Sequence, residues 1–381
     1  MRGRVLVLNA GSSTLKASLV EVDAPGDAPP PLAASIVEWG ADASRGADVE
    51  AGVLRALEGV GIDPVSDPGL ASVAHRVVHG GSAFTQPTVI DDATLTAIDT
   101  LAPLAPLHNP IAASTIRAAR RALPRIPHVA VFDTAFHATL PETAWRYPVP
   151  ASWDDWGIRR YGFHGLSVAW SVERAAQLLG RPAEALGLVV AHLGNGCSVT
   201  AVDAGRSVGT SMGMTPLEGL MMGTRAGSID PGIILAILRE RRLDPDGLAE
   251  VLDHRAGLLA VSGSSSDMRE LQVAADDEDA RAGLAIEMFV DRAAAAIAAA
   301  ATSLSMLDGV VFTGGIGEHA GRVRTAIVRR LAVLGVEAIS PEEVGGDRIL
   351  GGGGARHGPA VMRIGAREDI VATRAALAAI G

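Results

Sequence analysis

Four short turns rich in glycine and serine could bind phosphate groups. They read NAGSSTLK, HLGNGCS, SGSSSDMRE and TGGIGEH, and each follows an apolar stretch or leads into an expected helix. Backbone N–H groups at tight turns and helix N-termini match the oxygens of a polyphosphate. One such turn alone often only supplies a positive φ, but four together indicate a polyphosphate ligand. The chain has no GxxxxGK[ST] P-loop, and TGGIGEH lacks the full GxGxxG spacing of dinucleotide sites.

The first of these turns ends in Lys16, the only lysine among 33 basic residues. A compact ammonium on a thin stem fits a tight turn of small residues, where the planar five-donor fork of arginine does not. The lysine therefore indicates a contact with the phosphates. The alternative is chance, in a chain whose composition otherwise favours arginine.

Six further cationic or imidazole side chains lie in short motifs that could hold an anion. They are Arg76, Arg225, Arg269, His108, His164 and His192. Arg225 lies in MMGTRAGSIDPG among small and apolar residues with no acid before Asp230, which favours an anionic ligand. For the others, a solvated arginine or a structural histidine remains the alternative. No histidine pair has the HExxH spacing of a zinc site.

Strands must position these turns, and the pattern of strands occurs twice. An apolar run over Val5–Leu8, a small-residue turn and a second strand over Leu15–Val22 predict a hairpin. A second strand–turn–strand pattern runs from Leu186 to Val202, with the strong two-residue hairpin signal Asn195-Gly196. This repetition predicts an α/β fold of two duplicated lobes, each presenting a hairpin tip to an interlobe cleft.

Other elements follow from the same patterns. We expect strands in LAASIVEW, Val73–Val78, VAVFD at 129–133 and GVVFT; helices over 229–239, 285–304 and 91–122, the last broken by prolines; and loops at 23–31 and 351–354. Asp133 ends the VAVFD strand, and open α/β sheets place their sites at such strand ends.

Composition limits the possible functions. A chain of 381 residues suggests about two domains, and 48% hydrophobic residues suffice for two cores. The net charge of −10 argues against nucleic-acid or membrane-surface binding. The alanine run at 293–301 has polar flanks and predicts a buried helix, not a membrane span.

The N-terminal sequence and the cysteine content indicate in which cellular compartment the protein works. MRGRVLVLN lacks the apolar core of a signal peptide. A single cysteine, Cys197, excludes intrachain disulfides and cysteine-based zinc sites, and we expect it to be a small buried thiol. These features predict a cytoplasmic protein.

The motifs NAGSSTLK, HRVVHGG, LAPLHNP, VFDTAFHATLP, RRYGFHG, AHLGNGCS, TSMGMTPLEGLMMGTRAGSIDPG, SSDMRE and FTGGIGEH occur in this order. Together they closely resemble the acetate kinase family, from about residue 4 to 335. The resemblance implies the two-lobed fold shared with sugar kinases, Hsp70 and actin. It implies an N-terminal lobe of residues 1–135 plus 370–381 and a nucleotide-binding lobe of residues 136–369.

The resemblance also implies an activity and its partners. The reaction would be the reversible transfer of the ATP γ-phosphoryl group to acetate, giving acetyl phosphate and ADP, with Mg2+, in a homodimer that serves acetyl-CoA synthesis. The implied residues are Asp133, His164 and Arg225 for catalysis; Arg76, Val78 and His108 for the substrate; Asn9 and Glu368 for the metal; and Lys16, His192, Leu193, Gly194, Asn195, Gly196, Asp267, Met268, Arg269, Gly315, Ile316, Gly317, Glu318 and His319 for ATP.

Elementary electrostatics agrees with these roles. Phosphoryl transfer to a carboxylate brings two anions together, and each pair of unit charges at about 4 Å repels by about 4 kcal/mol at an effective dielectric constant near 20. Arg76, Arg225, His164 and Mg2+ could offset that repulsion. The acceptor is already ionised at neutral pH, so we expect Asp133 to orient Mg2+ or an arginine and not to act as a general base.

Five departures from the family pattern bear on these roles. Thr14 replaces the usual serine, Ser228 replaces an aspartate, and His319 replaces an asparagine. TGG replaces the family's usual TAG, and GARED, after an added glycine-rich stretch, replaces the usual TNEE. Glu368 is thus the nearest equivalent of the family's C-terminal glutamate, not an identical match.

Two alternatives stay open. One is a propionate or butyrate kinase of the same fold, because one methylene changes binding by only about 1–3 kcal/mol. The other is a non-catalytic, ATP-gated binding module. Such a module needs the ATP turns but neither Arg76 nor Arg225, and the chain has both.

Overall fold

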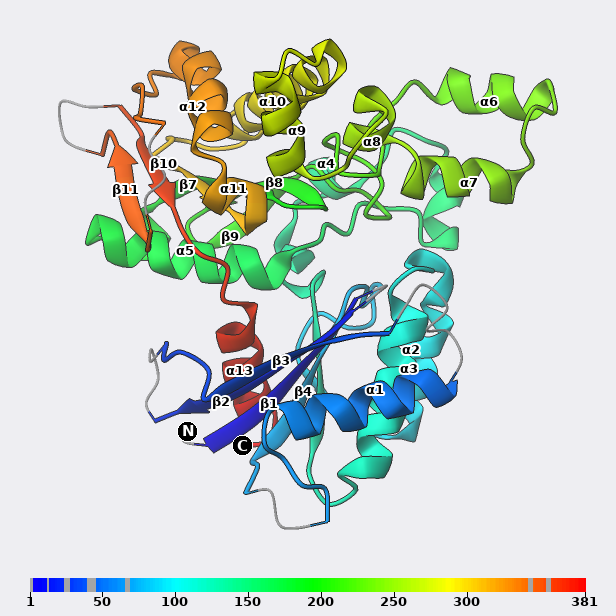
Figure 1. The fold of residues 1–381 in the computed structure, drawn as a ribbon. Helices are drawn as coiled ribbons and strands as arrows, with labels where there is room; N and C mark the ends of the chain where they lie inside the picture. The colour runs from blue at the N-terminus through cyan, green and yellow to red at the C-terminus, as the bar shows by residue number, and fades with distance from the viewer. Residues whose placement is uncertain are drawn as a thin grey trace. The chain divides into compact units, whose positions relative to one another are not determined.

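The computed structural model describes residues 3–11, 14–23, 28–39, 46–65, 69–341, 345–353 and 358–381. Ser12 and Ser13 at the tip of the first turn, part of the proline-rich loop expected at 23–31 and Gly354 in the loop expected at 351–354 lie outside these ranges. The chain forms two compact α/β units (Figure 1). The first comprises Met1–Ala138, Phe163–Leu166 and Arg367–Gly381, and the second Thr139–Gly162 and Ser167–Ala366.

The first unit is built on a six-stranded sheet with the order β3-β2-β1-β4-β6-β5. Its strands are β1 Gly3–Ala10, β2 Thr14–Val22, β3 Ala33–Glu38, β4 Ser72–Val77, β5 Thr88–Val89 and β6 His128–Phe132. The three central strands β1, β4 and β6 are parallel, whereas β2, β3 and β5 join antiparallel. The carboxyl ends of the parallel strands therefore meet at one edge, where Asn9, Arg76 and Asp133 lie.

Helices cover both faces of this sheet. They are α1 Gly46–Gly59, α2 Asp92–Thr100, α3 Asn109–Ala122 and α13 Glu368–Ala379, with 3-10 turns η1 Ala102–Leu104 and η2 Ala135–Thr139. Alternating residues of β1 and β2, such as Leu6, Leu8 and Leu15, form a core with α1 and α3. The α13 helix packs against β1, β2, β4 and β6, and Figure 1 shows it across the sheet from α1. The prolines divide the 91–122 segment into α2, η1 and α3, as expected.

The second unit repeats this sheet. Its strands are β7 Gly187–Leu193, β8 Cys197–Asp203, β9 Arg206–Thr210, β10 Gly309–Thr313, β11 Arg348–Gly351 and β12 Ala360–Arg363. Their order, β9-β8-β7-β10-β12-β11, has the same parallel and antiparallel relations as β3-β2-β1-β4-β6-β5. The expected fold class, two duplicated α/β lobes, is therefore confirmed.

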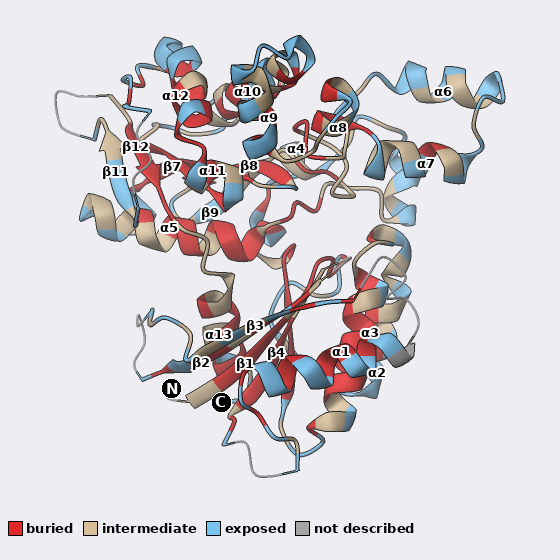
Figure 2. Ribbon diagram, viewed as in Figure 1, coloured by how far each residue is buried: buried red, intermediate tan, exposed pale blue. Residues whose placement is uncertain are grey.

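The following helices and 3-10 turns accompany the second sheet. They are α4 Glu142–Trp145, α5 Gly165–Leu179, α6 Pro231–Arg239, α7 Pro245–His254, α8 Gly257–Ser262, α9 Met268–Asp276, α10 Ala280–Ala301, α11 Gly314–His319 and α12 Gly321–Arg330, with η3 Ala151–Trp156, η4 Ala183–Ala185 and η5 Leu331–Leu334. Figure 2 shows the central strands buried and the outer helix faces exposed. In the part of the chain that the structure describes, no helix has the length and apolar character to cross a membrane.

The alanine-rich helix α10 differs in its bounds from the expected 285–304. It begins at Ala280 because the Asp279 side chain accepts hydrogen bonds from the backbone N–H groups of Arg281 and Ala282, and it ends at Ala301. Its buried face, which includes Ala285, Phe289 and Ile297, packs against β7 and β8.

Candidate active site

The ends of three strands and the start of α13 bring four polar residues together in the first unit. Asn9 on β1 and Arg76 on β4 are partners in the parallel register. Arg76 donates from Nε to Asp133 Oδ1 at 2.9 Å, from Nη2 to Asp133 Oδ2 at 2.5 Å, and from Nη1 to Asn9 Oδ1 at 3.0 Å. Glu368 Oε2 lies 3.6 Å from Arg76 Nε and accepts from Asn9 Nδ2 at 3.4 Å. We call Asn9, Arg76, Asp133 and Glu368 the arginine cluster.

The arginine cluster contains two carboxylates and one guanidinium. Burial opposes ionisation of Arg76, but attraction by Asp133 and Glu368 outweighs it, so the pKa of Arg76 is raised. Burial raises the pKa of Asp133, and repulsion by Glu368 adds to this, whereas Arg76 favours the ionised carboxylate. The two-point contact with Arg76 therefore holds Asp133 as an ion pair. The excess negative charge would favour a cation in this cluster.

His164 reaches this cluster through the segment Phe163–Leu166. Its backbone N–H donates to the Asp133 carboxylate, and Gly165 N–H donates to Asp133 O at 3.0 Å. A Cβ on Gly165 would lie 2.2 Å from Asp133 O, so only glycine permits this approach. His164 itself has φ +58°, a costly conformation for a non-glycine residue that is concentrated at functional sites.

Val78 precedes His79 and His108 precedes Asn109 in the chain. The buried side-chain amide of Asn109 joins these two segments. Asn109 Oδ1 accepts from His79 N–H at 3.1 Å, and Asn109 Nδ2 donates to His79 O at 2.9 Å. Val78, after β4, is buried, and His108, before α3, is half-buried. Sequence reasoning missed Asn109 as the residue that fixes these segments, although it is part of the quoted LAPLHNP motif.

Lys16 lies on β2 directly opposite Asn9 in the antiparallel register. Its side chain is exposed. Lys16 is therefore the cross-strand neighbour of Asn9, a member of the arginine cluster.

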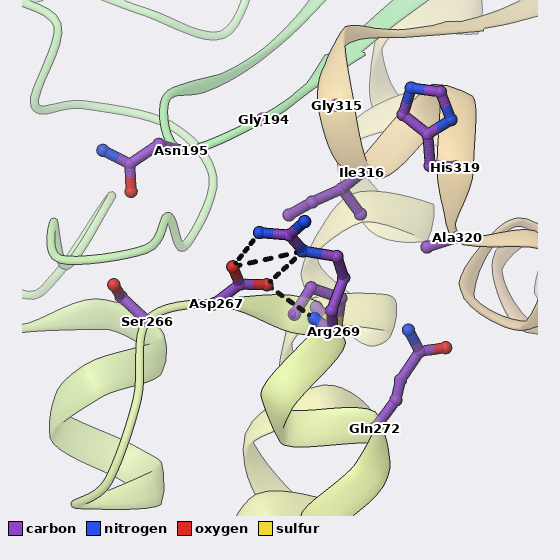
Figure 3. A pocket seen from close by; sticks show the side chains of 11 residues that line it. Gly194, Asn195, Ser266, Asp267, Arg269, Gln272, Gly315, Ile316, His319 and Ala320 are labelled. Carbon is purple, nitrogen blue, oxygen red and sulfur yellow. Dashed lines mark hydrogen bonds and ion pairs between the residues drawn. The ribbon is translucent and has the colours of Figure 1, made fainter. Parts of the chain in front are cut away.

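The second unit contains a cavity of about 470 Å³. It is lined by Gly194, Asn195, Ser266, Asp267, Met268, Arg269, Gln272, Gly315, Ile316, His319 and Ala320 (Figure 3). The β7–β8 hairpin tip, the start of α9 and the helix α11 supply these residues. Three of the four glycine- and serine-rich turns thus meet at one cavity.

Eight of the residues expected to bind ATP line this cavity. His192, Leu193, Gly196, Gly317 and Glu318 do not line it. The structure adds Ser266, Gln272 and Ala320. Ser266 lies in the quoted SGSSSDMRE turn, and Gln272 lies one helical turn beyond Met268, so helical spacing could have found it.

The start of α9 is fixed by Asp267. Its carboxylate accepts from Arg269 N–H at 2.8 Å and pairs with the Arg269 guanidinium at 2.6 Å. Figure 3 shows the Arg269 side chain turned toward Asp267. Contact with Arg269 lowers the pKa of Asp267.

Two glycines allow close packing around the cavity. Gly314, at the start of α11, has φ +76°, and a Cβ there would lie 2.8 Å from Leu193 O. A Cβ on Gly223 would lie 2.1 Å from Asn195 Oδ1. A larger residue at Gly314 would displace the backbone of the hairpin or of α11, and one at Gly223 would displace the Asn195 side chain.

Glu318 does not line the cavity. Its Oε1 accepts from Ala366 N–H at 2.9 Å, and its Oε2 lies 3.8 Å from Arg363 Nη2. Glu318 therefore ties α11 to the segment that follows β12.

Arg225 is half-buried within the second unit and donates from Nη1 to Pro216 O at 2.7 Å. Burial lowers its pKa, while Asp253 and Cys197 act in the opposite direction. Cys197 is buried, and burial raises the pKa of its thiol to about 12. The prediction of a buried cysteine is confirmed, and its thiol is unreactive at neutral pH.

The donor set of the arginine cluster suits a hard divalent cation. No group of three or more His, Cys, Asp or Glu side chains that could hold a metal occurs within the described ranges. Asn9, Asp133 and Glu368 nevertheless supply amide and carboxylate oxygens. Mg2+ is usually bound by one or two carboxylates together with substrate phosphates.

Comparisons with known proteins agree with one another. The model of the acetokinase family matches residues 4–352. The chain is 44% identical over 399 residues to an acetate kinase of Deinococcus radiodurans, covering 99% of this chain and 98% of the relative. It is 47% identical over 344 residues to an acetate kinase of Deinococcus deserti, covering 87% and 86%.

Solved structures share the fold over nearly the whole of both chains. The acetate kinase of Porphyromonas gingivalis is 32% identical with a TM-score of 0.86, covering 99% of this chain and 100% of that one. A propionate kinase from Francisella tularensis is 34% identical with a TM-score of 0.82, covering 98% of each chain.

Proposed function

Since this chain belongs to the acetokinase family, we propose that it is an acetate kinase, which transfers the γ-phosphoryl group of ATP reversibly to acetate. The products are acetyl phosphate and ADP. The observation that carries the assignment to a carboxylate substrate is Arg76, a half-buried guanidinium in the cluster with Asn9, Asp133 and Glu368.

The cavity of the second unit would bind the nucleotide. Met268, Ile316 and Ala320 would provide apolar walls for a base, and Asn195 at the hairpin tip and Gly315 near the start of α11 would suit phosphates. In the first unit, Arg76 would hold the acetate carboxylate, with Val78 and His108 beside it. Lys16 would contact the phosphates.

In the forward step, a carboxylate oxygen of acetate bonds to the γ-phosphorus. The bond from that phosphorus to the β–γ bridging oxygen breaks, and its electron pair leaves with ADP. No proton is gained or lost, so no general base is required. Asp133 would instead hold the guanidinium fork of Arg76 in one orientation.

Catalysis then consists of orienting the reactants and stabilising charge. The charge of the migrating phosphoryl group is spread over three equatorial oxygens, so several fixed donors suit it. Arg76, Arg225 and His164 would be these donors. When Mg2+ is bound with ATP, it neutralises phosphate charge, and the oxygens of Asn9 and Glu368 would hold it.

A propionate kinase remains the closest alternative, because the Francisella tularensis protein bears that name at 34% identity. The discriminating measurement is kcat/KM for acetate, propionate and butyrate, with the acyl phosphate trapped by hydroxylamine. Acetate should give the highest value. No acyl hydroxamate from any of the three acids would exclude the kinase function.

We also propose a homodimer in the cytoplasm. None of the nine residues of α6, all of them described, is buried, although its sequence is PGIILAILR (Figure 2). Ile233 and Leu235 are 47% and 50% exposed. A second copy of this chain would cover this apolar helix. Light scattering should give a dimer mass, and the double variant Ile233→Glu, Leu235→Glu should give a monomer; a dimeric double variant would contradict this interface.

A further inference from the structure

Two helices line the cavity of the second unit with pairs of residues one helical turn apart. Met268 and Gln272 lie four residues apart on α9, so they share one face of that helix. Ile316 on α11 and Ala320 directly after this helix have the same spacing. Because the two pairs line the same cavity, a planar base can lie between them.

An ion pair beside the cavity shows that Gln272 and Ala320 belong to the same end of it. Arg322 donates from Nη1 and Nη2 to the two carboxylate oxygens of Asp276, at 2.7 and 2.8 Å. Asp276 lies one turn beyond Gln272 on α9, and Arg322 follows Ala320 by two residues. The pair therefore holds the last turn of α9 against the start of α12.

The opposite end of the cavity contains Asn195 and Ser266. A Cβ built on Gly223 would be 2.1 Å from Asn195 Oδ1 and 3.5 Å from Ser266 Cβ, so these two side chains are neighbours. Figure 3 shows them on the side of the cavity away from Gln272. With the phosphates at the hairpin tip, as proposed above, the base lies toward Gln272.

The side-chain amide of Gln272 is the polar group available at the base end. It is half-buried, lines the cavity and makes no hydrogen bond to any residue that the structure describes. Arg269, by contrast, is paired with Asp267. The amide offers one acceptor oxygen and two N–H donors, so a ligand with an adjoining donor and acceptor can satisfy both kinds of atom.

We propose that Gln272 recognises the adenine of the nucleotide: its Oε1 accepts from the 6-amino group, and its Nε2 donates to the ring nitrogen beside that group. Glutamine is one of the two side chains that pair with adenine at two points in this way. Met268 and Ile316 contact the faces of the ring. The inference rests on the proposed function, because it assigns the base end of the same nucleotide site.

The first test combines a change in the protein with a change in the ligand. Purine riboside diphosphate differs from ADP only in lacking the 6-amino group. In titration calorimetry, the wild type should bind ADP about tenfold more tightly than this analogue, a loss on the scale of a two-point contact to a base. Gln272→Leu should bind the two ligands equally. Equal binding by the wild type, or the same preference in Gln272→Leu, would overturn the proposal.

Ser266→Ala is the matched control at the other end of the cavity. Ser266 also lines the cavity and is half-buried, and its hydroxyl has no hydrogen-bond partner in the described part of the chain. This variant should keep the wild-type ratio of the affinities for ADP and the analogue, whatever its effect on each. Loss of the ratio in Ser266→Ala as well as in Gln272→Leu would overturn a specific role for Gln272.

Gln272→Glu tests the pairing without a change in side-chain size. An ionised carboxylate accepts hydrogen bonds but cannot donate to the ring nitrogen of adenine. Guanine carries two adjoining N–H donors, which suit a carboxylate. The ratio of the affinities for ADP and GDP should therefore fall at least tenfold from its wild-type value. An unchanged ratio would contradict the proposed contact.

These binding measurements separate the role of Gln272 from the kinase function. Preference for ADP over the analogue in a protein that forms no acyl phosphate would reject the kinase function and support the role of Gln272. Normal acetyl phosphate formation together with equal affinities for ADP and the analogue would reject the role of Gln272 alone.

Discussion

Arg76 and Asp133 form a two-point ion pair at the ends of neighbouring parallel strands, with Nε to Oδ1 at 2.9 Å and Nη2 to Oδ2 at 2.5 Å. Only the planar guanidinium fork can make both contacts, so the pair fixes an orientation as well as a charge. The orientation follows from the sheet, because β4 and β6 are adjacent and in fixed register.

Asp133→Asn tests whether this orientation is what the reaction needs. The amide cannot accept both donors, so kcat should fall by about 100-fold or more, the usual scale for loss of a preorganised charge contact. The pH profile of the residual activity should keep its shape, since no general base is lost. Near-normal turnover with unchanged Mg2+ dependence would falsify the orienting role.

Lys16→Arg tests the single lysine. The side chain is exposed, so the free energy of unfolding should change by less than about 0.5 kcal/mol. We expect KM for ATP to rise, because the larger fork crowds a turn built of small residues. Steady-state kinetics with varied ATP measures this. Unchanged ATP kinetics would mean that the position of the lysine is accidental.

Gly314→Ala and Gly335→Ala form a matched pair. Both glycines have φ near +75°, but a Cβ on Gly314 meets Leu193 O at 2.8 Å, whereas one on Gly335 meets nothing within 4 Å. Each variant should lose about 1–2 kcal/mol for the left-handed backbone. Only Gly314→Ala should also weaken ADP binding. Equal ADP affinities in the two variants would show that the close packing at Gly314 has no role in the nucleotide site.

Three buried histidines of the first unit predict acid sensitivity. Burial lowers the pKa of His128 and of His137 to about 4, and burial, with repulsion by His128, lowers that of His75 well below 6.5. The unfolded chain binds these protons below pH 6.5 and the folded chain does not. Stability is therefore fully present above pH 6.5 and is lost as the pH falls toward 4, by about 1.4 kcal/mol per pH unit for each histidine.

His137→Gln isolates one of these contributions. The glutamine amide can still donate to Phe163 O, which His137 Nε2 contacts at 2.9 Å, but it cannot be protonated. Urea unfolding at pH 7, 6 and 5 should show a shallower loss of stability than in the wild type. The same slope in both proteins would mean that His137 is protonated equally in the folded and unfolded states.

The sequence predicts the strands and the duplicated hairpins well, because period-two apolar runs bounded by glycine-rich turns are strong local signals. The ends of helices were harder. The helix α10 begins at Ala280, five residues before the first residue expected, because the capping carboxylate of Asp279 acts through backbone N–H groups and not through hydrophobic periodicity. The exposed helix α6 is a different case. Its apolar sequence predicts a helix, but it does not predict that the rest of the chain leaves this helix exposed.

The residues of the site also divide into those that local motifs predict and those that depend on tertiary contacts. Motifs identify Arg76, Asp133 and the cavity turns, because each lies at a strand end or a glycine turn. They do not identify the contact between Ser167 and His192, or the partner of Glu318, which is the backbone N–H of Ala366. Such contacts join residues far apart in the chain and leave no local pattern.

The place of α13 in the chain has a consequence for biosynthesis. The helix that packs against β1, β2, β4 and β6 is made of residues 368–379, which follow the whole of the second unit. During translation, α13 can therefore cover its face of the first sheet only after these residues have left the ribosome. Glu368, the first residue of α13, likewise joins the arginine cluster only at the end of synthesis.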